Sequence, residues 1–119
     1  MSRKRNEPVT KETIRDEISM WVEQDGKSSG AWEMYMISTV KKMKTSYDAT
    51  MQYLKDITKE HFDFIIEGIE NVVYHFGRVE MVELIEALYV KFYGDDTDTE
   101  LYRDNIEPLR AVLRNSRKN

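Results

Sequence analysis

The chain has 119 residues, a formal net charge of −4 at pH 7 and no cysteine. This length suits one domain with a single core, and the lack of thiols excludes disulfides, thiolate metal sites and cysteine nucleophiles. Hydrophobic residues make up 40% of the chain and charged residues 34%, which is typical of folded globular proteins and excludes a wholly disordered chain.

The first nine residues, 1–9, are predicted to form a flexible basic tail. They begin "MSRKRNEP", which lacks the apolar stretch of a secretory signal. No later apolar run reaches the ~20 residues that a membrane span requires. We therefore expect a cytoplasmic protein with no membrane association.

Two helices are predicted in the first half of the chain. Thr10 is placed to cap the first, which carries apolar residues on one side and ends near Gln24, before a glycine–serine loop at Gly26. The second is expected to run unbroken over 31–56, because its apolar residues alternate at spacings of four and three. These residues are Trp32, Met36, Val40, Met43, Tyr47, Met51 and Leu54. A long packing helix within one domain is the favoured interpretation, and a coiled-coil dimer is the alternative.

The segment "EHFDFIIEGIENVVYHF", residues 60–76, predicts a third helix after the capping residue Thr58. Gly68 in its middle costs roughly 1 kcal/mol relative to alanine, which indicates a place where another helix comes close. Gly77 is expected to end this helix in the left-handed conformation. A fourth helix then begins almost at once and ends at Gly94, so the third and fourth helices should form an antiparallel hairpin.

A fifth helix is predicted after the loop "DDTDTE". Thr97 and Glu100 have capping-box spacing, and Pro108 should kink or restart the helix. Residues 115–119 are expected to form a second flexible basic tail. The predicted fold is an all-α, single-domain bundle of about five helices over residues 10–114, built from antiparallel helical hairpins, with a HEAT-like stack of hairpins as the alternative. The predicted core residues are Phe62, Ile65, Ile69, Val73, Ile85, Leu88 and Leu109.

Two sequence patterns resemble metal-binding sites, but each lacks a feature that metal binding requires. From Asp96 onward, acids stand at several ligand positions of a calcium-binding EF-hand loop, but the sixth position, which needs glycine, is Leu101. A capped helix start explains the same residues. His61 and His75 lie 14 residues apart, about 21 Å along one helix, which is too far for them to share a metal ion by themselves. We therefore expect no metal and no cofactor.

No catalytic signature stands out from the sequence. Carboxylates fall on the outward faces of the predicted helices, and neither a glycine-rich phosphate loop nor a nucleophile elbow is found. We therefore predict that the protein is not an enzyme and has no catalytic residues. Clusters of lysine and arginine at the two termini make nucleic acid an alternative partner, although a net charge of −4 and a pI near 5.3 are unfavourable for a dedicated nucleic-acid binder.

The most unusual feature is the distribution of charge. Residues 60–100 contain 11 acidic residues against Arg78 and Lys91, a net charge of −9. A surface of one sign accelerates association with an oppositely charged partner, and tyrosine is enriched at interface hot spots. The alternative is that the acids only provide solubility, or face the basic segment "VKKMK" across a groove. The predicted partner-binding residues are Glu60, Asp63, Glu67, Glu70, Tyr74, Glu83, Glu86, Tyr89, Tyr93, Asp95, Asp96 and Asp98.

The acidic stretch "FDFIIEGIENVVYHFGRVEMVELIEALYVKFYGDDTDTE", residues 62–100, resembles in composition and helical layout the small immunity proteins that bacteria make against toxins. The resemblance implies a non-enzymatic inhibitor that neutralises a basic toxin, often a nuclease, by occluding its surface. We therefore predict a monomeric protein-binding module whose partner is a protein with a basic surface. The alternatives are a regulatory adaptor encoded by a phage or host, a nucleic-acid-associated protein, and a structural dimer formed through the seam from Trp32 to Leu54.

Overall fold

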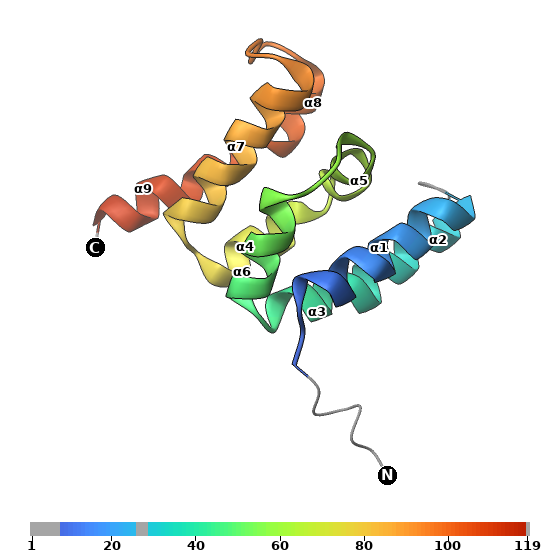
Figure 1. Cartoon of the computed structure of the whole chain (residues 1–119). Coiled ribbons are helices and arrows are strands. Elements are labelled where there is room, and N and C mark those ends of the chain that lie inside the picture. The colour runs from blue at the N-terminus through green and yellow to red at the C-terminus, as the bar shows by residue number, and fades with distance from the viewer. Residues whose placement is uncertain (1–7, 26–28, 119) are drawn as a thin grey trace.

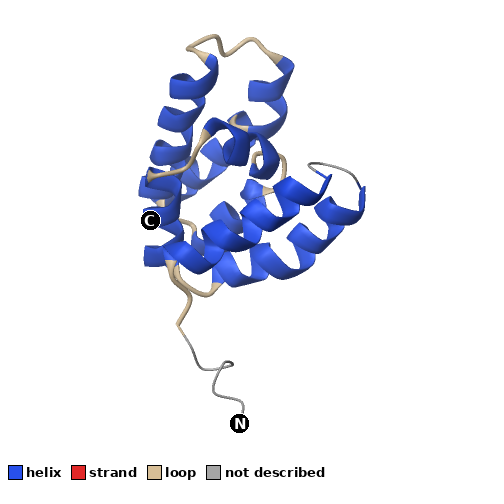
Figure 2. Cartoon of the chain, turned by 45° about the vertical axis from the view of Figure 1, so that its right-hand side comes forward, coloured by secondary structure: helices blue, strands red, loops and turns tan. Residues whose placement is uncertain are grey.

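The computed structural model describes residues 8–25 and 29–118, and these residues form helices and loops without a strand (Figure 2). The all-α prediction is confirmed, with about 80% of the described residues in helices. Most of the predicted tail 1–9, and Gly26 in the predicted loop, lie outside the described residues. The elements, labelled in Figure 1 where there is room, are α1 (Lys11–Asp25), α2 (Ser29–Met34), the π-helix η2 (Tyr35–Thr39), α3 (Val40–Lys44), α4 (Tyr47–Lys55), α5 (Lys59–Ile65), α6 (Ile69–Phe76), α7 (Val79–Tyr93), α8 (Glu100–Asn105), the 3-10 helix η3 (Glu107–Leu109) and α9 (Arg110–Lys118).

The described residues form seven helices rather than about five, when α2, η2 and α3 are counted as one helix, and α8 and α9, interrupted by η3, as another. The two additional helices arise because two of the predicted helices are broken. One break lies between α3 and α4, and the other lies between α5 and α6.

The predicted unbroken helix over 31–56 is interrupted between α3 and α4. The Thr45 hydroxyl donates to the carbonyl oxygen of Lys42 at 2.6 Å, and the backbone of Ser46 is extended, with φ −145° and ψ 106°. The Ser46 hydroxyl then accepts a hydrogen bond from the backbone N–H of Ala49 at 3.1 Å, which caps α4. The prediction is wrong here because the two hydroxyl side chains satisfy backbone groups at both helix ends, an effect that apolar spacing does not reveal.

The residues that face the core also differ from the predicted apolar seam in the first part of the predicted helix 31–56. η2 is a π-helix, whose i to i+5 hydrogen bonds make a wider turn than those of an α-helix. Tyr35 and Thr39 are buried there, whereas the predicted seam residues Trp32 and Met36 are only partly buried. The seam residues that are fully in the core are Val40, Met43 and Leu54.

The predicted third helix, 60–76, is broken at Gly68. A Cβ atom built on Gly68 would lie 2.7 Å from the sulfur of Met36 and 3.2 Å from the ring of Trp32. The close approach of another helix at this glycine is therefore confirmed. The chain turns over 66–68 around this contact, so the continuous helix is not formed.

We expect Gly68→Ala to lower the free energy of unfolding by about 1–3 kcal/mol, because the added methyl group must displace packed side chains. Gly30→Ala is the matched control, since a Cβ atom at Gly30 in α2 meets nothing within 4 Å. Alanine is the better helix former there by roughly 0.5–1 kcal/mol. Urea denaturation should therefore shift the two midpoints in opposite directions. A Gly68→Ala variant as stable as the wild type would contradict the close contact.

The predicted helix ends at Thr58, Gly77 and Gly94 are confirmed. The Thr58 hydroxyl accepts a hydrogen bond from the backbone N–H of His61 at 3.2 Å and caps α5. Gly77 has a φ of 63° and ends α6 in the left-handed conformation. Gly94, with a φ of 99°, ends α7.

The cap of α8 lies two residues later in the chain than the predicted cap. The Thr99 hydroxyl, not that of Thr97, accepts the backbone N–H that caps α8, at 3.1 Å. Both threonines lie before the first apolar residue, and only the actual backbone conformation selects between them. The break at Pro108 is as predicted, since η3 separates α8 from α9. The backbone of α9 continues to Lys118, past residue 114, where we placed the end of the helical domain.

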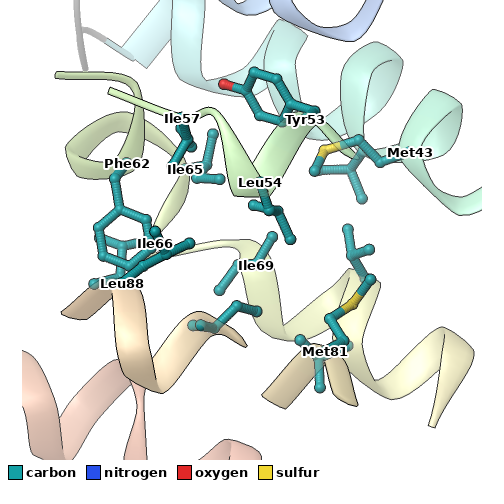
Figure 3. Close-up of a cluster of buried hydrophobic side chains, with 14 of the residues drawn as sticks. Met43, Tyr53, Leu54, Ile57, Phe62, Ile65, Ile66, Ile69, Met81 and Leu88 are labelled. Atoms are coloured by element: carbon teal, nitrogen blue, oxygen red, sulfur yellow. The ribbon is translucent and has the colours of Figure 1, made fainter. Parts of the chain in front are cut away.

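The core lies where α4, α5, α6 and α7 meet, and Figure 3 shows part of it. All the predicted core residues are buried: Phe62, Ile65, Ile69, Val73, Ile85, Leu88 and Leu109. α1 runs antiparallel to the α2–α3 run and packs along it, and α7 packs on α9 (Figure 1). α6 packs mainly on α3 and η3, and α7 mainly on α4 and α9. These two helices therefore diverge from the tight hairpin that the sequence predicts.

Candidate functional site

The 11 acidic residues between positions 60 and 100 lie along the surface from α5 to the start of α8. All of them belong to the described part of the chain, and none is buried. Several are held in ion pairs: Asp63 with Lys59 at 3.5 Å, Glu80 with Arg78 at 3.5 Å, Glu86 with Arg110 at 2.6 Å and Asp98 with Arg103 at 3.0 Å. The negative segment is therefore partly neutralised locally.

One group of predicted residues comes together where α5 meets the end of α7. The Lys59 ammonium lies 4.7 Å from the centre of the Tyr93 ring and 3.5 Å from a carboxylate oxygen of Asp63. The Tyr93 and Tyr89 rings have centroids 5.1 Å apart, and the Tyr89 hydroxyl lies 2.7 Å from that of Thr99. Asp63, Tyr93 and the acidic loop after α7 therefore share one region of the molecule.

A second group of predicted residues faces the C-terminal segment instead. Tyr74 is exposed on α6, and its hydroxyl donates to the carbonyl oxygen of Pro108 at 2.7 Å. Glu86 on α7 pairs with Arg110 of α9. Glu83 is exposed one turn before Glu86, on the same side of α7. The predicted site is therefore spread over two regions that contact different elements.

Tyr89 is a core residue rather than a surface anchor. Its side chain is 2% exposed, and its ring packs edge-on against that of Tyr102, with centroids 5.3 Å apart. The sequence places Tyr89 among the partner-binding residues, whereas the structure places its ring beside Leu88 on the buried face of α7. The hydroxyl needs no solvent because Thr99 satisfies it.

The acids of the loop before α8 support the structure of that loop. The Asp96 carboxylate accepts a hydrogen bond from the backbone N–H of Asp98 at 2.9 Å. Arg103 donates to both the carbonyl oxygen and the carboxylate of Asp98, at 2.9 and 3.0 Å. Within the described residues, no group of three or more histidine, aspartate or glutamate side chains is placed to hold a metal ion.

A polar cluster that the sequence did not reveal links α1 to η2 and α3. Lys42 donates to the carboxylate of Glu17 rather than facing the acidic helices. The hydroxyls of Ser38 and Thr39 also donate to Glu17, and Thr39 accepts a hydrogen bond from the Trp21 ring N–H at 2.9 Å. Burial raises the pKa of Glu17, but the three hydrogen bonds outweigh it, so the pKa lies below its usual value.

A cavity of about 250 Å³ lies between α1, α4 and α5. Its wall combines basic side chains, hydroxyl groups and an imidazole with an apolar part. The lining residues are Lys11, Arg15, Ser19, Tyr53, Asp56, Ile57, Thr58 and His61. Lys11 and Asp56 form an ion pair with each other at 2.8 Å. The lining therefore carries two fixed positive charges and one negative charge.

His61 stands between hydroxyl groups from two other helices. The Ser19 hydroxyl of α1 is 3.2 Å from Nε2 of His61, and the Tyr53 hydroxyl of α4 is 3.0 Å from Nδ1. Burial, together with Tyr35 nearby, raises the pKa of Tyr53, so Tyr53 is a neutral phenol whose buried proton needs an acceptor. Because Nδ1 of His61 serves as that acceptor, the imidazole proton lies on Nε2 and is directed at Ser19.

This tautomer suits ligand binding better than nucleophilic catalysis. A general base must take the proton of the serine that it activates, and an Nε2–H that donates to Ser19 cannot do so. The serine hydroxyl keeps its own proton, which it can donate to a molecule in the cavity. The arrangement of Ser19, His61 and Tyr53 can therefore hold and orient a ligand.

The charge state of His61 is set by its surroundings. Burial lowers the pKa of the imidazole, the Glu60 carboxylate opposes this effect, and the Arg15 guanidinium adds to it. Lys11 and Asp56 also line the cavity beside His61, as an ion pair. The pKa of His61 therefore lies below its usual value, and the imidazole is neutral at pH 7.

We expect the folded state to lose stability as the pH falls from about 7 to about 5. The unfolded state binds a proton at His61 near the ordinary pKa of ~6.5, above the pKa in the folded state. The contribution of neutral His61 to the stability of the folded state is therefore full above the pKa of the unfolded state. It is lost as the pH falls through the pKa of the folded state. His61→Gln should remove this part of the pH dependence, and His75→Gln, at an exposed position on α6, should retain it. Urea unfolding across this pH range measures the free energy of unfolding of each variant. Identical pH dependence in His61→Gln and wild type would refute the role of His61.

Sequence reasoning did not bring the cavity residues together, because they are distant in the chain. Ser19 lies 42 residues from His61, and Tyr53 lies eight residues away on another helix. The sequence does carry a local signal for these residues. Ser19, Tyr53 and His61 are each adjacent in the chain to a core residue, and so each lies in or beside the buried face of its helix. These core neighbours are Ile18, Leu54 and Phe62.

Comparison of the chain with protein-family models, curated proteins and solved structures gives no match. Among the described residues, no helix combines the length and the apolar character that crossing a membrane requires. Two features therefore carry the functional argument: the acidic side chains from α5 to α8, and the cavity beside His61.

Proposed function

We propose that the protein is a non-catalytic binding module that docks a basic protein partner through its acidic surface. The acidic surface consists of the 11 acidic side chains between positions 60 and 100, which lie from α5 to the first residue of α8. The observation that supports this function is the net charge of −9 on residues 60–100, in which no acid is buried. Such a surface steers an oppositely charged partner toward it and disfavours partners of like charge.

The specific form that we propose is a cytoplasmic, monomeric inhibitor of the immunity-protein type, which occludes the active surface of a basic toxin such as a nuclease. The resemblance of residues 62–100 to small immunity proteins supports this form. The acidic surface needs neither a cofactor nor a catalytic group for such inhibition. Its repulsion costs a few tenths of a kcal/mol for each pair of like charges on a helix, and a bound basic partner relieves that cost.

Two double charge reversals test the proposal and locate the contact. Glu60→Lys with Asp95→Lys alters the region where α5 meets the loop, and Glu70→Lys with Glu83→Lys alters α6 and α7. The variant that changes the contacting region should slow association on the order of tenfold at low salt, and less at high salt, where screening already weakens the wild type. The partner is isolated from host lysate with the wild-type protein, and association rates are then measured at low and high salt.

The matched control is Glu12→Lys with Glu23→Lys, which makes the same change in net charge at exposed positions of α1. The control should associate at close to the wild-type rate. If neither test variant slows association at either salt concentration, the interface lies outside the acidic surface. For the inhibitor form, the isolated partner should lose its toxic activity when the wild-type protein saturates it, and full activity in the complex would refute that form.

A further inference from the structure

The cavity between α1, α4 and α5 differs from the acidic surface in the sign of its charge. Lys11 and Arg15 outnumber the single carboxylate, Asp56, and His61 adds an imidazole. Its volume of about 250 Å³ is slightly below the roughly 300–1,000 Å³ of most ligand pockets. The cavity therefore suits a small molecule with a negative group.

Hydrogen-bond donors exceed acceptors along the wall of the cavity. Lys11 has three N–H donors, and its contact with Asp56 uses one of them. Arg15 has five, and two of its nitrogens lie 3.3 Å from one oxygen of Asp16, an exposed pair that contributes little. The Ser19 hydroxyl, which accepts from the imidazole, keeps one proton to donate. An oxyanion group matches this set of donors.

The rest of the wall is apolar. The Tyr53 ring and the Ile57 side chain are both buried and line the cavity. An apolar wall next to a few placed polar groups is the usual composition of a small-molecule site. A bound molecule should therefore have a short apolar body in addition to its negative group.

We propose that the cavity binds a small organic anion, a molecule that carries a carboxylate or a phosphate on a short apolar body. The negative group contacts Lys11, Arg15 and Ser19, and the body packs on Tyr53 and Ile57. Carboxylate and phosphate share the required chemistry, and the experiment below separates them. The inference does not rest on the proposed protein partner, and its test needs none.

Titration with benzoate and with phenyl phosphate, followed by NMR of the histidine side chains, tests the proposal. The imidazole resonances of His61 should shift and saturate with at least one of these probes, because the negative group binds beside that ring. His75, exposed on α6, is the internal control and should not show the saturable shift. Benzyl alcohol and benzamidine have similar apolar bodies without the negative charge, and they should give no saturable shift at His61. The stronger of the two anionic probes identifies the preferred group.

Two substitutions with opposite expected effects complete the test. Arg15→Gln removes a cation and should weaken binding of the preferred probe roughly tenfold or more, as expected for the loss of a charge-assisted hydrogen bond. Asp56→Asn removes the competing carboxylate and frees Lys11, so it should tighten binding, a result that misfolding cannot imitate. No saturable shift at His61 with either anion, equal binding of the neutral probe, or unchanged affinity in both variants would overturn the proposal.

Discussion

Replacement of Ile69 by alanine is expected to lower the free energy of unfolding by about 2–5 kcal/mol. Ile69 is fully buried and begins α6 directly after the turn at Gly68. Figure 3 shows it in the middle of the buried cluster, close to Leu54 of α4 and Ile66. The neighbouring side chains are fixed on several helices and cannot collapse fully into the space left by the truncation, so the cost of a cavity adds to the lost burial.

Ile37→Ala is the matched control for this prediction. Ile37 is 67% exposed, so the same truncation should change stability by no more than about 0.5 kcal/mol. Urea unfolding followed by far-UV circular dichroism gives both values, and an unchanged slope shows that the difference lies in stability rather than in the denatured state. If Ile69→Ala cost no more than Ile37→Ala, the placement of α6 in the core would be refuted.

The parts of the fold that the sequence predicts correctly depend on local physical chemistry. Thr58 caps a helix by its own hydroxyl, and Gly77 adopts a left-handed conformation that other residues avoid. Apolar periodicity likewise identifies the buried face of a helix once the helix is continuous, as it does for Ile85 and Leu88 on α7. These effects can be read from a few neighbouring residues, and the structure agrees with them.

The breaks in the predicted helices depend on choices that the local pattern leaves open. Serine and threonine stand inside many helices, and only the satisfied hydrogen bonds of Thr45 and Ser46 show that two helices meet there. At Gly68 the sequence indicated a close contact, but not that the chain would turn around the side chain of Met36, 32 residues earlier. Contacts between segments that are distant in the chain decide whether a helix is broken at such positions.

The two candidate sites also differ in how far the sequence predicts them. Net charge is a property of the sequence, so the acidic surface could be predicted, whereas the burial of Tyr89 within it could not. The cavity depends on the packing of α1, α4 and α5. No spacing rule connects Ser19 to His61, and only the folded chain places their side chains 3.2 Å apart.

The polar cluster around Glu17 leads to the second large expected effect. Glu17 has a side chain that is 12% exposed and accepts hydrogen bonds from Ser38, Thr39 and Lys42. Leucine at this position fills similar space but leaves the two hydroxyls without that acceptor. Lys42 is 40% exposed and can turn to water, so its loss contributes little. We expect Glu17→Leu to cost about 2–4 kcal/mol, most of it from the hydroxyl donors left unpaired.

Glu17→Gln separates the charge of this side chain from its hydrogen bonding. The amide oxygen still accepts from the hydroxyls, so this variant should lose less stability than Glu17→Leu. Because the pKa of Glu17 is lowered in the folded state, its ionised form contributes stability above its ordinary pKa of 4.5, and this stability is lost as the pH falls through the folded pKa. The stability of Glu17→Gln should therefore fall less steeply in acid than that of the wild type. Glu23→Gln, exposed on the same helix, should fall as steeply as the wild type, and the same slope in Glu17→Gln would show that the carboxylate does not hold α1 against α3.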